Sequence, residues 1–127
     1  MPPAELEGVH RRKTGALIAA ACVIGGLAAG APAATCEALR AYGADVGLAF
    51  QIYDDVLDAT ATSDQLGKTA GKDAAGGKST FVTLLGAKAA RAEAERLATR
   101  AVDRLGEAGL ISPTLAALAR YIVTRPN

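Results

Sequence analysis

Apolar residues recur three and four positions apart over most of this chain, which is the spacing of one helix face. The longest such stretch begins near Ala33 and continues to Leu57. Alanine, leucine, glutamate and arginine dominate the sequence, and these residues favour helix over sheet. There is no Trp, and the three Tyr and two Phe are few for a protein built of strands. The pattern predicts an all-α protein.

Glycine and proline divide this pattern into separate helices. Helices are expected over residues 10–29, 33–57, 79–105 and 114–123. Residues 1–9 contain two prolines and are expected to be a short lead into the first helix. Residues 63–77 are rich in glycine and lysine and are expected to form a loop. Because 127 residues, half of them apolar, suffice for one core, we expect a single domain, 1–127.

The first expected helix also has features of a secretion signal. Residues 14–36 carry no charge, they follow the basic run His10–Lys13, and Ala31-Pro32-Ala33 is similar to a signal-peptidase site. A secreted or membrane-anchored protein is therefore one alternative. The stretch is mostly Ala and Gly, which is weak for a bilayer span. Its larger apolar residues follow helical spacing around one broad face, which favours a close-packed soluble helix.

Charge and cysteine content narrow the function classes. Fourteen basic and thirteen acidic residues leave a formal charge of +1, so the composition implies no attraction to nucleic acid or membrane. Any phosphate binding has to be local. Cys22 and Cys36 lie in alanine-rich segments without a CxxC or Cys/His cluster. We interpret them as small buried residues, which fits a reducing, cytoplasmic location.

Three aspartates, Asp54, Asp55 and Asp58, form a DDxxD pattern near the expected end of the second helix. Positions three and four apart lie on the same side of a helix, so the carboxylates are predicted to share one side. No Lys or Arg lies within a turn along the chain to offset their repulsion. A bound cation would offset it, and oxygen ligands without His or Cys favour Mg²⁺. A solvated acidic helix end is the alternative.

Two further segments have the composition of phosphate-binding sites. Glycines and lysines alternate over residues 67–79, including Lys68 and Lys78, where backbone N–H groups and ammonium groups can approach a phosphate. The Walker pattern requires glycine where this loop has Lys72, so we reject a P-loop. Lys13 and Thr14 begin the first helix and are placed to hold an anion. A flexible basic loop and a solvated charge run are the respective alternatives.

The three segments together resemble the trans-isoprenyl diphosphate synthases, most closely the bacterial farnesyl diphosphate synthases. The matching segments, in order, are Lys13-Thr14-Gly15-Ala16-Leu17, Tyr42-Gly43, Gly47-Leu48-Ala49-Phe50-Gln51 leading into Asp54-Asp55-x-x-Asp58, Gly67-Lys68 and Gly77-Lys78-Ser79-Thr80-Phe81. The resemblance extends over about residues 6–125 and corresponds to the C-terminal half of such enzymes. It implies part of an all-α helical bundle of the isoprenoid synthase type, usually a homodimer.

The resemblance also implies a reaction and a role for each motif. In the family, Mg²⁺ assists an allylic diphosphate to lose pyrophosphate, and isopentenyl diphosphate captures the allylic cation. Asp54 and Asp58 would ligate Mg²⁺, with Asp55 in the same cluster. The remaining residues implied in catalysis or substrate binding are Lys13, Thr14, Phe50, Gln51, Lys68 and Lys78.

Part of the family pattern has no counterpart here. The first aspartate-rich motif and the N-terminal isopentenyl diphosphate segment are missing, and the C-terminal segment 121–127 has one basic residue where several members have more. Our first hypothesis is a part of a prenyltransferase that needs an N-terminal half in trans. The alternatives are a non-catalytic partner subunit of a full-length synthase and, less favoured, a secreted helical protein. A bundle cut in half is expected to self-associate.

Overall fold

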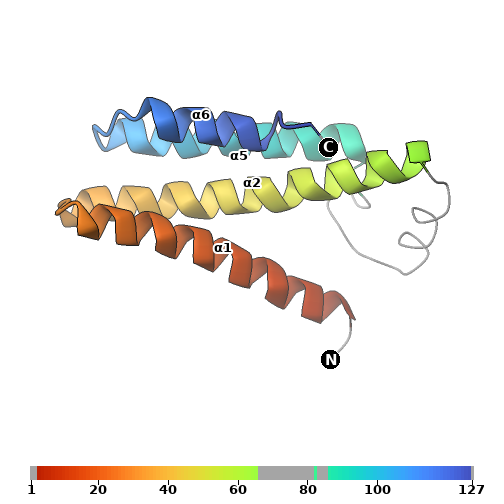
Figure 1. The fold of residues 1–127 in the computed structure, drawn as a ribbon, viewed down its shortest axis with the longest axis horizontal. Coiled ribbons are helices and arrows are strands. Elements are labelled where there is room, and N and C mark those ends of the chain that lie inside the picture. The colour runs from red at the N-terminus through yellow and green to blue at the C-terminus, as the bar shows by residue number, and fades with distance from the viewer. Residues whose placement is uncertain (1–2, 66–81, 83–85, 127) are drawn as a thin grey trace.

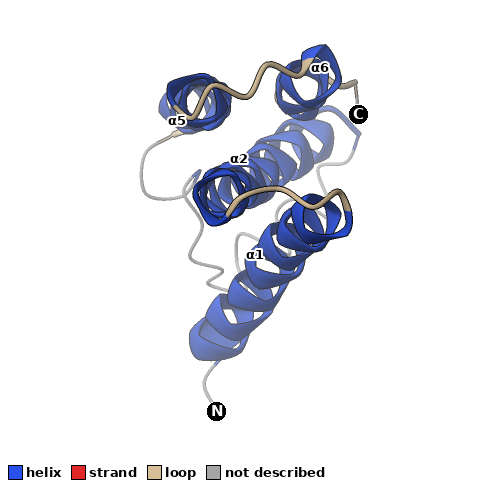
Figure 2. Ribbon diagram, turned by 90° about the vertical axis from the view of Figure 1, so that its left-hand side faces the viewer, coloured by secondary structure: helices blue, strands red, loops and turns tan. Residues whose placement is uncertain are grey.

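Long helices make up most of the chain (Figure 1). The computed structural model describes residues 3–65, 82 and 86–126. The helices are α1 (Pro3–Ala28), α2 (Ala33–Gln65), α5 (Ala87–Glu107) and α6 (Pro113–Ile122). No strand occurs in the described part, so the all-α prediction is confirmed. Figures 1 and 2 show α2 between α1 on one side and the α5–α6 pair on the other.

The first two helices are longer than the sequence pattern predicts. Helix α1 begins at Pro3, so the expected lead over residues 1–9 is wrong from that residue on. Proline is tolerated in the first turn of a helix, and the Ala and Glu residues after it are good helix formers. Helix α2 continues to Gln65 instead of ending at Leu57. No Gly or Pro interrupts it there, and the aspartates therefore lie well inside the helix.

Glycine and serine set the boundaries of the last two helices. The third helix is not continuous from 79 to 105 as expected, because Gly86 has a φ of 85° and caps α5, which starts at Ala87. Residues other than glycine rarely adopt that backbone conformation.

The predicted N-cap Ser112 of α6 is confirmed, since its side chain accepts a hydrogen bond from the Leu115 backbone N–H. The loop expected over 63–77 is helical at 63–65, and the rest lies outside the described residues.

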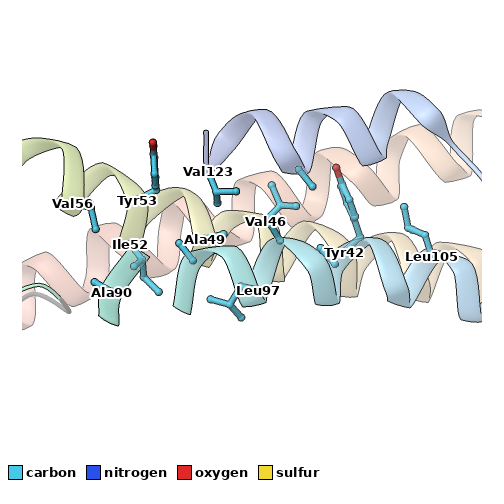
Figure 3. Close-up of a cluster of buried hydrophobic side chains, with 14 of the residues drawn as sticks. Tyr42, Val46, Ala49, Ile52, Tyr53, Val56, Ala90, Leu97, Leu105 and Val123 are labelled. Carbon is cyan, nitrogen blue, oxygen red and sulfur yellow. The ribbon is translucent and has the colours of Figure 1, made fainter. Parts of the chain in front are cut away.

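One face of α2 forms the core with α5 and α6 (Figure 3). The buried residues of α2 recur at helical spacing. They are Leu39, Tyr42, Val46, Ala49, Ile52, Tyr53 and Val56. Helix α5 meets this face with a row of buried alanines and two leucines, and small side chains let the two helices approach closely. The core therefore makes α2 the central element.

Two tyrosines of α2 also bind the C-terminal part of the chain. The Tyr42 hydroxyl donates to the Leu115 carbonyl oxygen over 2.7 Å, and the Tyr53 hydroxyl donates to the Arg125 carbonyl oxygen over 3.1 Å. In Figure 3 both rings rise from α2 toward the side on which α6 lies. Burial, with a smaller effect of Cys22, raises the pKa of Tyr42 to about 12, so its hydroxyl stays protonated as a donor.

A buried carboxylate joins α2 to α5. The side chain of Asp45 is 7% exposed and accepts hydrogen bonds from Arg100 at 2.7 and 3.0 Å and from Arg104 at 2.7 Å. Burial alone raises the pKa of Asp45, but the hydrogen bonds from the two arginines outweigh it. The resulting pKa is lower than usual, and the carboxylate stays charged in the folded protein.

Helix α1 contacts the opposite side of α2 through residues with little or no side chain. The backbones of Gly43 and Gly47 in α2 approach those of Ala19 and Gly15 in α1. Within the described chain, α2 is the helix that α1 contacts. The two helices then diverge toward the N-terminal end of α1 (Figures 1 and 2). The docking of α1 thus depends on close backbone contact near its middle.

Three of the larger apolar side chains of α1 do not face this contact, whereas Ile18 packs against the core. Leu17, Ile24 and Leu27 are 70%, 64% and 63% exposed. The expectation of a close-packed helix is therefore wrong for these three side chains. The reason is that α2 accepts the small-residue side of α1, which includes Gly15 and Ala19.

Both cysteines are free, as predicted. Cys36 is buried and Cys22 is half-buried, where burial raises the pKa of its thiol. No helix among the described residues has the length and apolarity needed to cross a bilayer.

Replacing Gly43 by Ala tests the close contact. The added Cβ would lie 2.7 Å from Cα of Ala19, so we expect a loss of about 1–3 kcal/mol in the free energy of unfolding. Gly25→Ala is the matched control, because a Cβ there meets open space and should add about 0.5–1 kcal/mol through helix propensity. Urea unfolding followed by circular dichroism measures both. Equal stabilisation by the two variants would show that the contact is not tight.

Replacing Asp45 by Asn tests the buried carboxylate through pH. The pKa of Asp45 is lower in the folded state than in the unfolded state, where it is about 3.9. The carboxylate therefore stabilises the fold at pH values above the unfolded-state pKa, and this stabilisation is lost as the pH falls through the folded-state pKa. We expect the wild type to be more stable than Asp45→Asn at pH 7 and the difference to narrow toward pH 3. Urea titrations across this range measure it. The exposed Asp103→Asn is the control and should change the free energy of unfolding at pH 7 by less than about 0.5 kcal/mol.

Candidate functional site

The aspartates of the DDxxD motif lie on the side of α2 away from its core face. Ile52, Tyr53 and Val56 are buried, whereas Asp54 and Asp58 are exposed and Asp55 is half-buried. Asp54 and Asp58 are one turn apart, and both are offset around the helix axis from the buried positions, so helical periodicity places them away from the core. The core packing of α2 thus directs the DDxxD motif outward.

A positive charge reaches the motif from the C-terminal segment. Nη2 of Arg125 lies 3.6 Å from Oδ1 of Asp54. The sequence shows no basic residue within a turn of the aspartates, and it is the tertiary structure that supplies one. Sequence reasoning missed this partner because Asp54 lies in α2 and Arg125 lies after the end of α6, far away in the sequence. The one available signal was that Arg125 is the basic residue of the segment 121–127.

Aromatic rings hold the guanidinium of Arg125. It lies over the Phe50 ring at 4.9 Å and over the Tyr53 ring at 5.4 Å from their centroids. Its Nε donates to the Ile122 carbonyl oxygen over 3.2 Å. Phe50, expected to bind substrate, is half-buried beneath this guanidinium. The C-terminal segment is therefore packed directly beside the predicted metal ligands.

A cavity of about 350 Å³ opens between α1 and α2. Gln51 borders it from α2 and Arg12 borders it from α1. The other lining residues are Gly15, Ala16, Ala19, Arg40, Ala44, Gly47 and Leu48. Arg40 is ion-paired with Glu37 of its own helix. Small side chains leave this space, and Gly15 and Gly47, which lie at the close contact of the two helices, also border the cavity.

The structure places the remaining predicted site residues as follows. Lys13 is exposed and Thr14 is half-buried on α1, and neither borders the cavity that Gln51 lines. Gln51 lies on the same stretch of α2 as the aspartates. Lys68 and Lys78 lie outside the described residues.

Among the described residues, no three His, Cys, Asp or Glu side chains converge closely enough to hold a metal ion by themselves. The donor set of the motif nevertheless suits Mg²⁺, because it consists of carboxylate oxygens on a solvent-facing side of α2. Mg²⁺ keeps several waters and commonly takes one or two carboxylates plus substrate phosphates. The aspartates fit such a partial set and would need oxygen ligands from outside the described residues.

Comparison with known proteins identifies the family. The family model described as polyprenyl synthetase matches residues 3–110. The chain belongs to the polyprenyl synthetase family. The resemblance inferred from the motifs is confirmed, and the helical bundle is consistent with the all-α isoprenoid synthase fold.

Several relatives are similar over nearly the whole chain. Geranylgeranyl pyrophosphate synthase 10, mitochondrial, of Arabidopsis thaliana is 44% identical over 124 residues, which cover 96% of this chain and 36% of that protein. Dimethylallyltranstransferase of Fischerella ambigua is 45% identical over 124 residues, covering 98% of this chain and 36% of that protein. Geranylfarnesyl diphosphate synthase, chloroplastic, of Leucosceptrum canum is 43% identical over 122 residues, covering 95% and 34%.

The chain thus spans about a third of the length of the curated relatives it matches. The matched stretch is their C-terminal part. This partial coverage is consistent with the single DDxxD motif in the sequence.

Replacing Tyr53 by Phe tests how the C-terminal segment is held beside the site. Loss of the hydrogen bond to the Arg125 carbonyl should lower the free energy of unfolding by about 0.5–1.5 kcal/mol. Hydrogen exchange at residues 121–126 should speed up in the same variant. Tyr121→Phe is the control, since that side chain is 58% exposed and should change stability by less than about 0.5 kcal/mol. Unchanged exchange in Tyr53→Phe would contradict the anchoring role.

Proposed function

We propose that this chain supplies the second aspartate-rich half of the active site of a Mg²⁺-dependent trans-prenyltransferase. The proposed reaction joins an allylic diphosphate to isopentenyl diphosphate. One observation carries the proposal: α2 presents Asp54 and Asp58 on its exposed side, and Gln51, one turn before Asp55 on the same helix, borders a cavity. Family membership supports it, and relatives are named for this class of transfer.

In this proposal the residues of the chain bind and orient the allylic diphosphate. Asp54 and Asp58 would hold Mg²⁺, with Asp55 in the same cluster, and a metal ion bound there would supply positive charge toward the departing pyrophosphate. Lys13, Lys68 and Lys78 contribute positive charge toward the same group, which stabilises the transition state more than the ground state.

The reacting end of the allylic chain is assigned to the apolar and neutral residues of the site. Thr14, Phe50 and Gln51 would line it. Support comes from the position of Gln51 at the cavity between α1 and α2, whose lining is largely Gly and Ala. The small side chains leave room for an isoprenoid tail, and the guanidinium groups of Arg12 and Arg40 also border this space.

Product length and location stay predictions. The motifs favoured a farnesyl diphosphate synthase, whereas the relatives named above include geranylgeranyl and geranylfarnesyl synthases. A product of farnesyl or geranylgeranyl class is therefore proposed without choosing between them. We keep the cytoplasmic prediction as well, although relatives carry mitochondrial and chloroplastic names.

A non-catalytic partner subunit is the second candidate, and the surface of α1 favours association of some kind. Leu17, Ile24 and Leu27 recur at helical spacing and are largely exposed. A homodimer, a complementary synthase half or a full-length synthase would cover them. The catalytic proposal predicts turnover when an N-terminal half is added, and the subunit proposal predicts tight binding to a full-length synthase without such rescue.

Replacing Asp54 by Ala tests the proposed metal site. Isothermal titration of the purified chain with a non-hydrolysable allylic diphosphate analogue should show binding that requires Mg²⁺. We expect Asp54→Ala to weaken this binding at least about tenfold, since a metal ligand is lost.

Asp103→Ala is the matched control, because it removes an exposed aspartate from α5, on the other side of the core. It should bind like the wild type. Mg²⁺-independent binding, or equal binding by Asp54→Ala, would exclude the proposed role of the motif. Binding followed by no turnover with an added N-terminal half would favour the subunit.

A further inference from the structure

Arg125 lies beside the DDxxD motif in an arrangement that lowers the stability of the fold. Arg125 is 19% exposed, and its Nη2 is buried without a hydrogen-bond partner in the described structure. The 3.6 Å separation from Oδ1 of Asp54 is within ion-pair range but too long for a hydrogen bond. Burying a guanidinium nitrogen without a hydrogen bond lowers stability. The contact is therefore one of charge, and it leaves the Asp54 oxygen open to other ligands.

The position of this charge is fixed on several sides. The guanidinium lies over the rings of Phe50 and Tyr53, and its Nε donates to the Ile122 carbonyl oxygen. The backbone of Arg125 is tied to α2 by the Tyr53 hydroxyl. A second guanidinium, that of Arg91, lies 5.2 Å from the centroid of the Tyr53 ring. The side chain and backbone of Arg125 are thus both held by contacts with other residues.

A fixed positive charge beside a metal ligand acts differently on different ions. It repels a divalent cation that binds Asp54 alone, and it attracts a cation that arrives with a multiply charged anion. The neighbouring Asp55 and Asp58 add negative charge to the same side of α2, so the net effect of Arg125 is to offset part of their attraction for free metal.

We infer that Arg125 is a positioning residue that makes the Asp54 site select a metal–diphosphate complex over the free metal ion. The inference rests on the proposed function of Asp54 as a Mg²⁺ ligand. The residue that would cause this selection, Arg125, lies in the C-terminal segment, outside the DDxxD motif.

Two titrations of the full chain test this inference, each with wild type and Arg125→Met. The first uses Mn²⁺ alone, followed by electron paramagnetic resonance. The second uses inorganic pyrophosphate at saturating Mg²⁺, followed by calorimetry. In Arg125→Met the Kd for Mn²⁺ alone should fall by about three- to tenfold, and the Kd for pyrophosphate should rise by a similar factor. Arg125→Lys should restore both values toward wild type, because an ammonium group can lie over the same rings.

Arg120→Met is the control, since it removes the same charge from the exposed surface of α6 and should change neither Kd. If Arg125→Met does not fold, Arg125→Gln removes the charge while keeping polar contacts and carries the same expectation. A merely structural role would weaken both kinds of binding together, and that result overturns the inference, as does no change in either. Wild type that is folded but binds neither probe would overturn the proposed function of Asp54 as well.

Discussion

The packing of α2 against α5 and α6 determines where every other feature of this chain lies. Large side chains such as Tyr42 and Ile52 are fully buried on one face of α2, which fixes the rotation of that helix about its axis. Once that rotation is set, Asp54 and Asp58 have to face outward, because they are offset from the buried positions by helical periodicity. The same face carries the tyrosine hydroxyls that hold α6 and the C-terminal segment. Core packing and site geometry are therefore one constraint.

On the opposite side of α2, helix α1 is held by close backbone contact. There, glycine and alanine allow the two backbones to approach until Gly47 lies against Gly15. Helix α1 is held by this contact while Leu17 and Ile24 remain exposed. An element attached in this way is suited to accept a further layer of protein. This agrees with a chain that spans about a third of its relatives.

The two aspartate–arginine contacts of α2 show how one residue pair serves different ends. Asp45 is buried and accepts full hydrogen bonds from Arg100 and Arg104, so its charge is satisfied and joins two helices. Asp54 is exposed and lies 3.6 Å from Arg125, beyond hydrogen-bond range. The first carboxylate has no free capacity for a ligand of similar strength. The second keeps this capacity, which suits the proposed role of Asp54 as a metal ligand.

The sequence by itself determined the helical class, the family and the shared side of the DDxxD motif, because these follow from spacing along one helix and from motif order. It misplaced the start of α1 and the end of α2, where neighbouring residues are all compatible with helix. Only the tertiary structure decided that Arg125 lies at Asp54, that Arg100 and Arg104 enclose Asp45, and that α1 docks by its small residues. These contacts join segments far apart in the chain, and their free energy depends on which helix faces meet, a choice that no local pattern contains.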